Sequence, residues 1–147
     1  MKYPCAGIII YRFFNNSLQF ALVKSKRGRY SFPKGKREKG ETNYECAIRE
    51  TKEETGVLEK DLTFVKNSSN EYYTYDEYSK NKNRSIIYYL AEIKENKNLI
   101  PEDSDELSWA GWLNFTDIQA LPEEEFKKDR IDIAINIAQH LMAQNIK

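Results

Sequence analysis

The chain has 147 residues, and its 23 Lys and Arg balance 23 Asp and Glu, so the formal net charge is zero. This length predicts a single domain over residues 1–147. The charge balance argues against stable binding to nucleic acid or to an acidic membrane through bulk charge. The apolar run from Ala6 to Tyr11 is too short for a signal peptide or a membrane span. We therefore expect a folded cytoplasmic protein and favour a monomer.

The cysteine and histidine contents limit the kinds of site that the chain can build. Cys5 and Cys46 are too few for a disulfide framework or an all-cysteine zinc site. Two buried, reduced thiols are the favoured interpretation, and one disulfide between them is the alternative. His140 is the single histidine, so a site that needs two histidines is excluded. Its place opposite the apolar stripe of the C-terminal segment predicts a surface position.

The N-terminal third of the sequence predicts strands. Cys5–Phe14 and Leu18–Val23 are apolar runs with a turn signal at Asn15–Ser17 between them, so they predict a hairpin. Tyr30–Phe32 is expected to be extended, because the proline that follows disfavours helix before it. The basic segment Pro33–Gly40 is expected to be a loop.

The best-marked helix of the sequence follows this loop. Thr42 and Glu45 have the spacing of a capping box, and Gly56 suits the left-handed position after a helix end. The helix is therefore predicted over residues 43–55. Side chains at helical spacing are expected to face the core: Tyr44, Ala47, Ile48, Thr51 and Thr55.

The remainder of the chain predicts more strands and a final helix. Extended segments are expected at Leu62–Val65, Glu71–Tyr75, Ser85–Ile93 and Leu107–Leu113, with a polar loop at Ser79–Asn83. An apolar stripe at helical spacing predicts the C-terminal helix: Ile131, Ala134, Ile135, Ala138, Leu141 and Met142. Together these elements predict a mixed α/β sandwich.

One face of the helix at 43–55 is acidic. At about 100° of rotation per residue, Glu50, Glu53 and Glu54 fall within about a third of the helix circumference. Glu50 and Glu54 are one turn apart and repel each other, at a cost of about 0.2–0.5 kcal/mol. A divalent cation would reverse this repulsion, and oxygen ligands favour Mg²⁺ or Mn²⁺ over zinc. The alternative is a solvated acidic stripe with Arg49 and Lys52 beside it.

The segment before the helix favours the metal site. It contains glycines and leads directly onto the acidic face, and it carries the cations Lys34, Lys36, Arg37 and Lys39. A polyphosphate requires cations or backbone amides for its oxygens and a metal to neutralise charge at the attacked phosphorus. Loop and helix together therefore predict a metal-dependent polyphosphate site.

The loop and helix together resemble the signature of the Nudix hydrolases. Gly35 is followed after five residues by Glu41, and after seven more by the run Arg49-Glu50-Thr51-Lys52-Glu53-Glu54-Thr55-Gly56-Val57. Every position that the signature specifies fits except Thr51, where Leu, Ile or Val is usual. The resemblance implies the Nudix α/β/α sandwich, in which a mixed sheet packs with the signature helix and a C-terminal helix.

The resemblance also implies roles for the signature residues. It implies a divalent metal held by the carbonyl of Gly35 and by the carboxylates of Glu41, Glu50, Glu53 and Glu54. One glutamate, with Glu50 preferred, would instead orient or deprotonate the attacking water. Arg49 would hold the carboxylates by charge-assisted hydrogen bonds. The implied reaction is hydrolysis of a nucleoside diphosphate linked to another group.

Features outside the signature resemble the asymmetrical diadenosine tetraphosphate hydrolases of that family. Counterparts there are the lead-in Phe32-Pro33-Lys34-Gly35, the Thr at position 51, and Arg84 four residues ahead of Tyr88. The stretch from Asp105 to Leu113 resembles one that supplies a further metal ligand, which implies Glu106. Phosphate contacts are expected from Lys34, Lys36 and Arg84, and stacking on adenine from Tyr30, Tyr73 and Tyr88. The alternative for each tyrosine is an ordinary core position.

More than one function remains open at this stage. The leading hypothesis is hydrolysis of diadenosine tetraphosphate to ATP and AMP with Mg²⁺ or Mn²⁺. Removal of the messenger RNA cap is second, because Phe32–Lys36 and Cys46–Glu50 also resemble decapping Nudix enzymes, although the chain has no net positive charge for RNA. Hydrolysis of diphosphoinositol phosphates is third. A non-catalytic nucleotide-binding Nudix module is the alternative from another class, and the complete set of glutamates argues against it.

Overall fold

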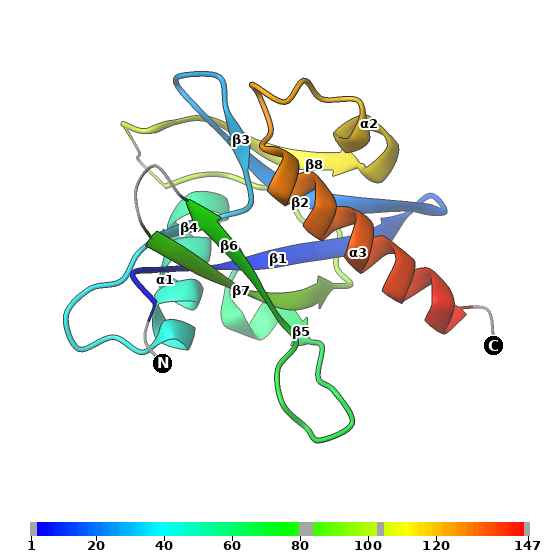
Figure 1. Cartoon of the computed structure of the whole chain (residues 1–147), viewed down its shortest axis with the longest axis horizontal. Coiled ribbons are helices and arrows are strands. Elements are labelled where there is room, and N and C mark those ends of the chain that lie inside the picture. Colours follow the sequence, from blue (N-terminus) through cyan, green and yellow to red (C-terminus); the bar gives the residue numbers. More distant parts are fainter. Residues whose placement is uncertain (1–2, 80–83, 103–104, 146–147) are drawn as a thin grey trace.

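The computed structural model describes residues 3–79, 84–102 and 105–145. Figure 1 shows how the elements follow one another along the chain. They are β1 (Cys5–Phe14), β2 (Ser17–Ser25), β3 (Tyr30–Ser31), β4 (Lys34–Lys36), α1 (Asn43–Thr55), the 3₁₀ turn η1 (Glu59–Asp61), β5 (Leu62–Phe64), β6 (Thr74–Ser79), β7 (Arg84–Ile93), β8 (Leu107–Asn114), α2 (Phe115–Gln119) and α3 (Lys128–Asn145). No helix among the described residues combines the length and apolar character needed to cross a lipid bilayer.

One mixed sheet connects the strands around β1. β1 pairs in parallel with β7, from Cys5 opposite Ile86 to Tyr11 opposite Glu92. It pairs antiparallel with β2 and β4, and β2 pairs in turn with β8. On the other side, β7 pairs antiparallel with β5 and β6. Parallel strands require a long crossover connection, and the connection from β1 to β7 contains α1.

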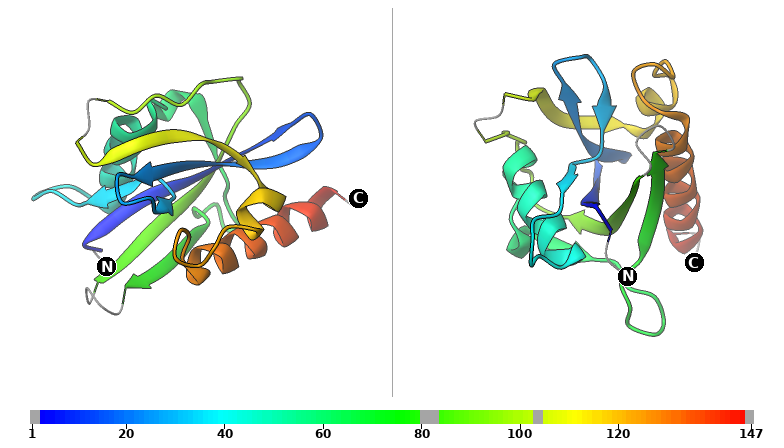
Figure 2. Two further views of the ribbon diagram at one scale, coloured as in Figure 1. Left: turned by 90° about the horizontal axis from the view of Figure 1, so that it is seen from above. Right: turned by 60° about the vertical axis from the view of Figure 1, so that its left-hand side comes forward.

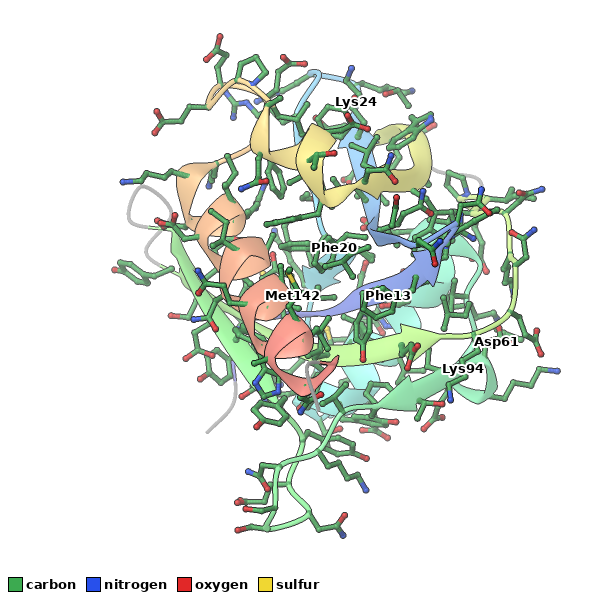
Figure 3. The ribbon with its side chains drawn as sticks, turned by 90° about the vertical axis from the view of Figure 1, so that its right-hand side faces the viewer. Phe13, Phe20, Lys24, Asp61, Lys94 and Met142 are labelled. Carbon is green, nitrogen blue, oxygen red and sulfur yellow. The ribbon has the colours of Figure 1, made fainter. Side chains whose placement is uncertain are left out.

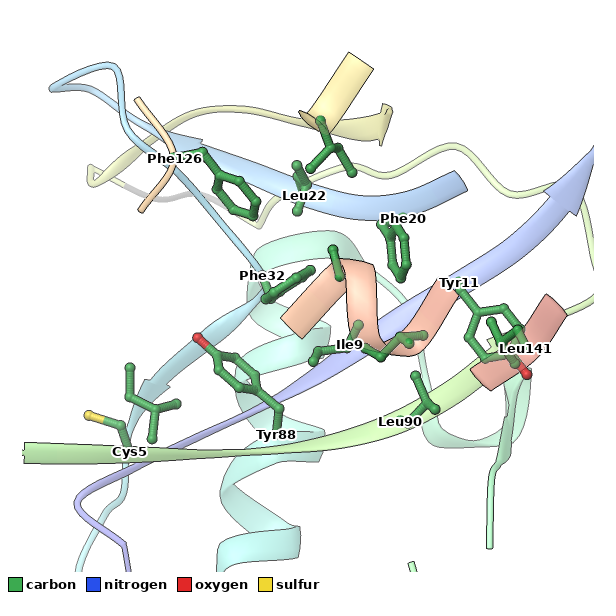
Figure 4. Close-up of a cluster of buried hydrophobic side chains, with 14 residues drawn as sticks. Cys5, Ile9, Tyr11, Phe20, Leu22, Phe32, Tyr88, Leu90, Phe126 and Leu141 are labelled. Atoms are coloured by element: carbon green, nitrogen blue, oxygen red, sulfur yellow. The ribbon is translucent and has the colours of Figure 1, made fainter. Parts of the chain in front are cut away.

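Helices α1 and α3 lie on opposite sides of this sheet (Figure 2). Side chains of β1 alternate between the two layers, so that Ile9 and Tyr11 pack toward α3, whereas Ile8 and Ile10 pack toward α1. Both faces of β1 are buried, which explains why its sequence is continuously apolar. Figure 4 shows the cluster on the α3 side. This layering confirms the predicted α/β/α sandwich.

Helix α1 begins and ends where its sequence predicts. The Glu45 backbone N–H donates to the Thr42 hydroxyl at 3.0 Å, and the Thr42 N–H donates to the Glu45 carboxylate at 2.9 Å, which completes the capping box. Gly56 ends the helix with φ of 76°, and its N–H donates to the Lys52 carbonyl at 2.9 Å. The core-facing prediction also holds: Ala47, Thr51 and Thr55 are buried, and Tyr44 and Ile48 are half-buried.

Some elements depend on long-range contacts that local patterns do not show. The predicted loop at 33–40 contains β4, because Lys34–Lys36 pairs with the start of β1. β6 lies further along the chain than the predicted segment Glu71–Tyr75, where it pairs with β7. Helix α2 was not predicted. Of the predicted polar loop at 79–83, Ser79 ends β6 and residues 80–83 lie outside the described residues.

The C-terminal helix and the cysteines show both agreement and correction. Ala134, Ala138 and Leu141 are buried as predicted, but Met142 is 59% exposed near the C-terminal end of α3 (Figure 3). His140 is half-buried rather than on the open surface, because its ring packs against another aromatic ring. The two cysteines are free and buried, as favoured, and lie on opposite sides of the sheet.

Replacing Thr42 with Ala should lower the free energy of unfolding by about 1 kcal/mol, within a range of about 0.5–2, because the helix loses its capping acceptor. Urea unfolding followed by circular dichroism measures this. Thr42→Ser keeps the hydroxyl and should stay within about 0.5 kcal/mol of the wild type. Equal losses in both variants would show that the cap does not stabilise α1.

Candidate functional site

Arg49, in the middle of α1, lies at the centre of the acidic face. Its Nε and Nη2 donate to the two carboxylate oxygens of Glu41 at 2.6 and 2.9 Å, a bidentate pair between loop and helix. Its Nη1 donates to Glu50 at 2.8 Å and to Glu53 at 3.1 Å. Nη2 also donates to the Lys36 carbonyl at 2.9 Å. One guanidinium therefore gathers three carboxylates and fixes the end of β4 to α1.

Glu41 stays ionised well below neutral pH in this arrangement. Its hydrogen bonds with Arg49, together with the one that the Glu38 backbone N–H donates at 2.8 Å, lower the pKa of Glu41 to about 2. The loop between β4 and α1 thus carries a fixed negative charge beside the helix face.

Gly35, on β4, lies directly against the acidic face. A side chain at this position would overlap the carboxylate of Glu50 where it now lies, so glycine permits the close approach that the structure shows. The Gly35 carbonyl accepts a weak hydrogen bond from the Cys46 thiol at 3.6 Å. Because a carbonyl oxygen has two lone pairs, it has capacity for a second partner. The structure thus brings Gly35 and Glu50 together, while their role as metal ligands stays a prediction.

Glu54 faces the start of β4. Its Oε1 accepts a hydrogen bond from the Lys34 backbone N–H at 3.1 Å. Burial, with smaller contributions from the charges of Glu50 and Glu106, raises the pKa of Glu54 to about 7. Burial also raises the pKa of Glu50 above its usual range, despite the hydrogen bond from Arg49. These carboxylates are therefore close enough to repel one another, and water solvates them incompletely.

This donor set fits a hard divalent cation. The donors are carboxylate oxygens and the Gly35 carbonyl, and a bound cation would offset both the burial and the smaller repulsion that raise the pKa of Glu54. Over residues 3–79, 84–102 and 105–145, no three acidic, cysteine or histidine side chains are already clustered as metal ligands. The carboxylates of Glu41, Glu50 and Glu53 point instead to Arg49.

Lys34 connects the acidic face to the α3 side of the sheet. It pairs with Gly7 of β1, whose side of the sheet is that of Cys5 in the α3-side cluster. The pKa of Lys34 is lowered, because burial and the charge of Arg130 outweigh the opposing charges of Glu54 and Glu77. Lys34 thus places a partly desolvated cation next to Glu54. The Lys36 side chain is exposed beyond it.

The tyrosines predicted to stack on adenine have unequal access. Tyr88 is fully buried in the α3-side cluster and donates to Glu77 at 2.9 Å, so its ring offers no face to a base (Figure 4). The structure contradicts the prediction for Tyr88, because both faces of the central strand β7 are covered. Tyr73 is half-buried, with its ring centroid 5.0 Å from that of His140. Tyr30 is half-buried on β3, four residues before Lys34.

Two further predicted residues lie at the margins of the site. Arg84 begins β7 opposite Ser79, but its side chain lies outside the described part of the structure, so its phosphate contact stays a prediction. Glu106 is exposed just before β8, and its carbonyl accepts from the Lys26 N–H at 3.0 Å. Its charge contributes to the raised pKa of Glu54, and its role as a metal ligand stays a prediction.

A buried ion pair behind Lys34 was not predicted. Arg130 of α3 donates through Nε to Glu77 of β6 at 2.9 Å and through Nη1 to the Tyr30 carbonyl at 2.8 Å. Arg130 is 7% exposed and Glu77 is 1% exposed. The sequence signal was an arginine on the apolar stripe, four residues before Ala134. The ion pair ties α3 to β6, and the hydrogen bond to Tyr30 ties α3 to β3, the strand that precedes Lys34.

The sequence match to a known family shows which family the protein belongs to. The family model described as the NUDIX domain matches residues 2–132. The chain belongs to the Nudix family. Members of this family generally use divalent metal ions, in agreement with the oxygen donors gathered around Arg49.

Individual relatives refine this placement within the Nudix family. The asymmetrical bis(5'-nucleosyl)-tetraphosphatase of Mus musculus is 32% identical over 103 residues, covering 65% of this chain and 68% of the relative. The messenger RNA decapping enzyme subunit 2 of Arabidopsis thaliana is 33% identical over 104 residues, covering 70% of this chain but 26% of the relative. A solved Caenorhabditis elegans Ap4A hydrolase binary complex matches in fold with a TM-score of 0.79 and 24% identity, covering 96% and 98% of the two chains. The predicted resemblance to asymmetrical diadenosine tetraphosphate hydrolases is confirmed.

Replacing Arg130 with Met should destabilise the protein by about 3–5 kcal/mol, because Glu77 then stays buried without its cation. Urea unfolding at pH 7 measures the loss. The double variant Glu77→Leu/Arg130→Met removes both charges and should recover most of it. A loss below about 1 kcal/mol in the single variant would show that buried Glu77 does not need the Arg130 cation.

The same pair predicts a pH dependence. Burial raises the pKa of Glu77, but the charge of Arg130 and the hydrogen bonds from Arg130 and Tyr88 outweigh it, so the pKa lies below the ordinary value of 4.5. A lowered folded-state pKa stabilises the fold fully above that ordinary value and less as the pH falls through the folded-state pKa. Lowering the pH through the folded-state pKa of Glu77 should therefore reduce the free energy of unfolding more in the wild type than in the double variant.

Proposed function

We propose that this Nudix protein hydrolyses diadenosine tetraphosphate asymmetrically, to ATP and AMP. The observation that carries the proposal is the juxtaposition of the acidic face around Arg49 with Lys34, whose backbone N–H binds Glu54. Two relatives that are 32% and 33% identical to this protein are asymmetrical bis(5'-nucleosyl)-tetraphosphatases. A long row of phosphates requires both a metal-holding acidic face and a neighbouring cation. The protein supplies the acidic face on α1 and the cation on the adjoining strand β4.

The proposed metal is Mg²⁺, with Mn²⁺ as the substitute. Its ligands would be the carboxylates of Glu50, Glu53 and Glu54 and the Gly35 carbonyl, with Glu41 and Glu106 as further contacts. When bound, the cation would neutralise phosphate charge and make an attacking water more acidic. Oxygen-only donors support this choice over zinc.

The remaining residues would orient substrate and water around that centre. Arg49 holds Glu50 and Glu53 at fixed positions on α1, which supports Glu50 as the residue that orients or deprotonates the water. Lys34, Lys36 and Arg84 would bind phosphate oxygens. Tyr30 is the proposed aromatic contact for the base, since Tyr88 is buried and Tyr73 packs against His140.

Messenger RNA decapping is the second candidate function. The similarity to a decapping enzyme subunit supports it, but that similarity spans about a quarter of the relative's length. The balanced charge of this chain gives long RNA little electrostatic attraction. Diphosphoinositol hydrolysis ranks third, and a non-catalytic nucleotide-binding module ranks below the enzymes because the signature glutamates are complete.

Three properties outside the chemistry belong to the same proposal. We propose that residues 1–147 form one domain that acts as a monomer in the cytoplasm. The two free, buried thiols support a reducing compartment. The large buried clusters on both sides of one sheet support a single folding unit.

Incubating the intact chain with Mg²⁺ and diadenosine tetraphosphate should release ATP and AMP in equal amounts, because water attacks one end of the phosphate chain. Chromatographic separation of the products measures this. ADP as the sole product would refute the asymmetric cut. Release of capped nucleoside diphosphate from long RNA, with dinucleotides left intact, would favour decapping instead.

The matched variants Glu54→Gln and Glu124→Gln test where the chemistry occurs. Glu54→Gln should lower kcat by about 10²-fold or more, because the site loses an acidic oxygen that contacts metal or water. Glu124 is exposed between α2 and α3, so Glu124→Gln should leave kcat unchanged. Unchanged activity in Glu54→Gln would move the reaction away from α1.

A further inference from the structure

A row of side chains crosses three strands on the α3 side of the sheet. Lys24 of β2 pairs with Tyr30 of β3 and with Trp109 of β8, so the three side chains project from one face. The Trp109 and Tyr30 rings meet edge to face with centroids 5.8 Å apart, and the Lys24 ammonium lies 4.9 Å from the Tyr30 centroid. Figure 3 shows Lys24 on β2, far from Met142 at the end of α3. We call this row the Trp109 corner.

Two local features aim the Trp109 ring. The pairing of β2 with β8 shifts register between Lys24 and Ser25, and the Ser108 hydroxyl donates to both of their carbonyls, at 3.3 and 3.2 Å. Such an irregularity re-aims a neighbouring side chain. Two residues further on, a side chain at Gly111 would overlap the Trp109 ring, so glycine lets the ring lie over the strand.

Trp109 keeps access to solvent in this position. It is 36% exposed, as one of several large hydrophobic side chains that stay accessible among the described residues. Trp112, the other tryptophan, provides the contrast. Its ring lies on the α1 side, 4.1 Å from the Arg12 guanidinium, and its Nε1 donates to the Lys97 carbonyl at 2.9 Å. Packing and hydrogen bonding occupy Trp112, whereas Trp109 retains exposed aromatic surface.

Both rings of the Trp109 corner lie close in sequence to residues of the proposed phosphate site. Trp109 is three residues from Glu106, whose charge acts on Glu54. Tyr30 is four residues from Lys34 on the same side of the sheet. The backbone of Tyr30 is fixed from α3 and the segment before it, since its N–H donates to the Glu125 carbonyl at 2.7 Å and its carbonyl accepts from Arg130.

We propose that Trp109, with Tyr30 as its side wall, is the platform on which a purine base of the substrate stacks. This inference rests on the proposed function and adds the residue that holds the base. An aromatic face stacks any base, and stacking needs an exposed ring held in a fixed orientation. Ser108 and Gly111 supply that orientation, and Tyr30 limits the platform on one edge.

The two tryptophans allow a direct test by fluorescence. In Trp112→Phe only Trp109 emits, and in Trp109→Phe only Trp112 emits. Titration with ATP in EDTA should quench the emission of Trp112→Phe and leave that of Trp109→Phe nearly unchanged. Inorganic tripolyphosphate, which has no base, should leave both unchanged. Quenching of Trp112→Phe by tripolyphosphate as strongly as by ATP would overturn the platform.

Affinity gives a second readout by calorimetry with ATP. Trp109→Ala should weaken ATP binding by about 5- to 150-fold, the range expected for loss of one stacked base, and Trp109→Phe should recover most of it. Trp112→Phe is the matched control and should bind as the wild type does. Wild-type affinity in Trp109→Ala would overturn the inference. Quenching at Trp109 without cleavage of diadenosine tetraphosphate would refute the proposed function alone.

Discussion

The arrangement of the site depends on the guanidinium of Arg49. Carboxylates one turn apart on a helix repel each other, and burial makes their charge still less favourable. Arg49 offsets this by donating to Glu41, Glu50 and Glu53 at once. Its bond to the Lys36 carbonyl also fixes β4 against α1, which brings Gly35 onto Glu50. A solvated acidic stripe with Arg49 as a surface partner does not explain the close approach of Gly35 to Glu50 or the burial that raises the pKa of Glu54.

The residues that we propose for substrate binding lie on both sides of the sheet. The α1 layer presents the acidic face, and the α3 layer carries Lys34 and the Trp109 corner. On the α3 side, the buried pair of Arg130 with Glu77 joins α3 to β6, and Arg130 also holds the Tyr30 carbonyl of β3. The C-terminal helix thus stabilises the strand that leads to the phosphate site, although it contributes no residue to the signature.

Features of the fold that depend on neighbouring residues were predicted from the sequence, whereas features that depend on residues far apart in the sequence were not. The capping box of Thr42 and Glu45 is local, so the limits of α1 were predicted to the residue. Strand β4 exists through pairing with Cys5–Gly7, nearly thirty residues away, which no local pattern shows. Tyr88 was wrongly predicted to bind the base, because the sequence does not show that both faces of its strand are covered. Trp109 was not singled out from the sequence, because its pairing with Lys24 beside the register shift is a long-range feature.

Calorimetric titration of the intact chain with Mg²⁺, with and without tripolyphosphate, tests the central claim most directly. We predict that the wild type and Glu124→Gln take up the ion. The double variant Glu53→Gln/Glu54→Gln should lose this uptake, and all three chains should remain folded. Absence of uptake by the wild type under both conditions, or equal uptake by the double variant, would contradict the claim that the Arg49-centred face holds a divalent metal.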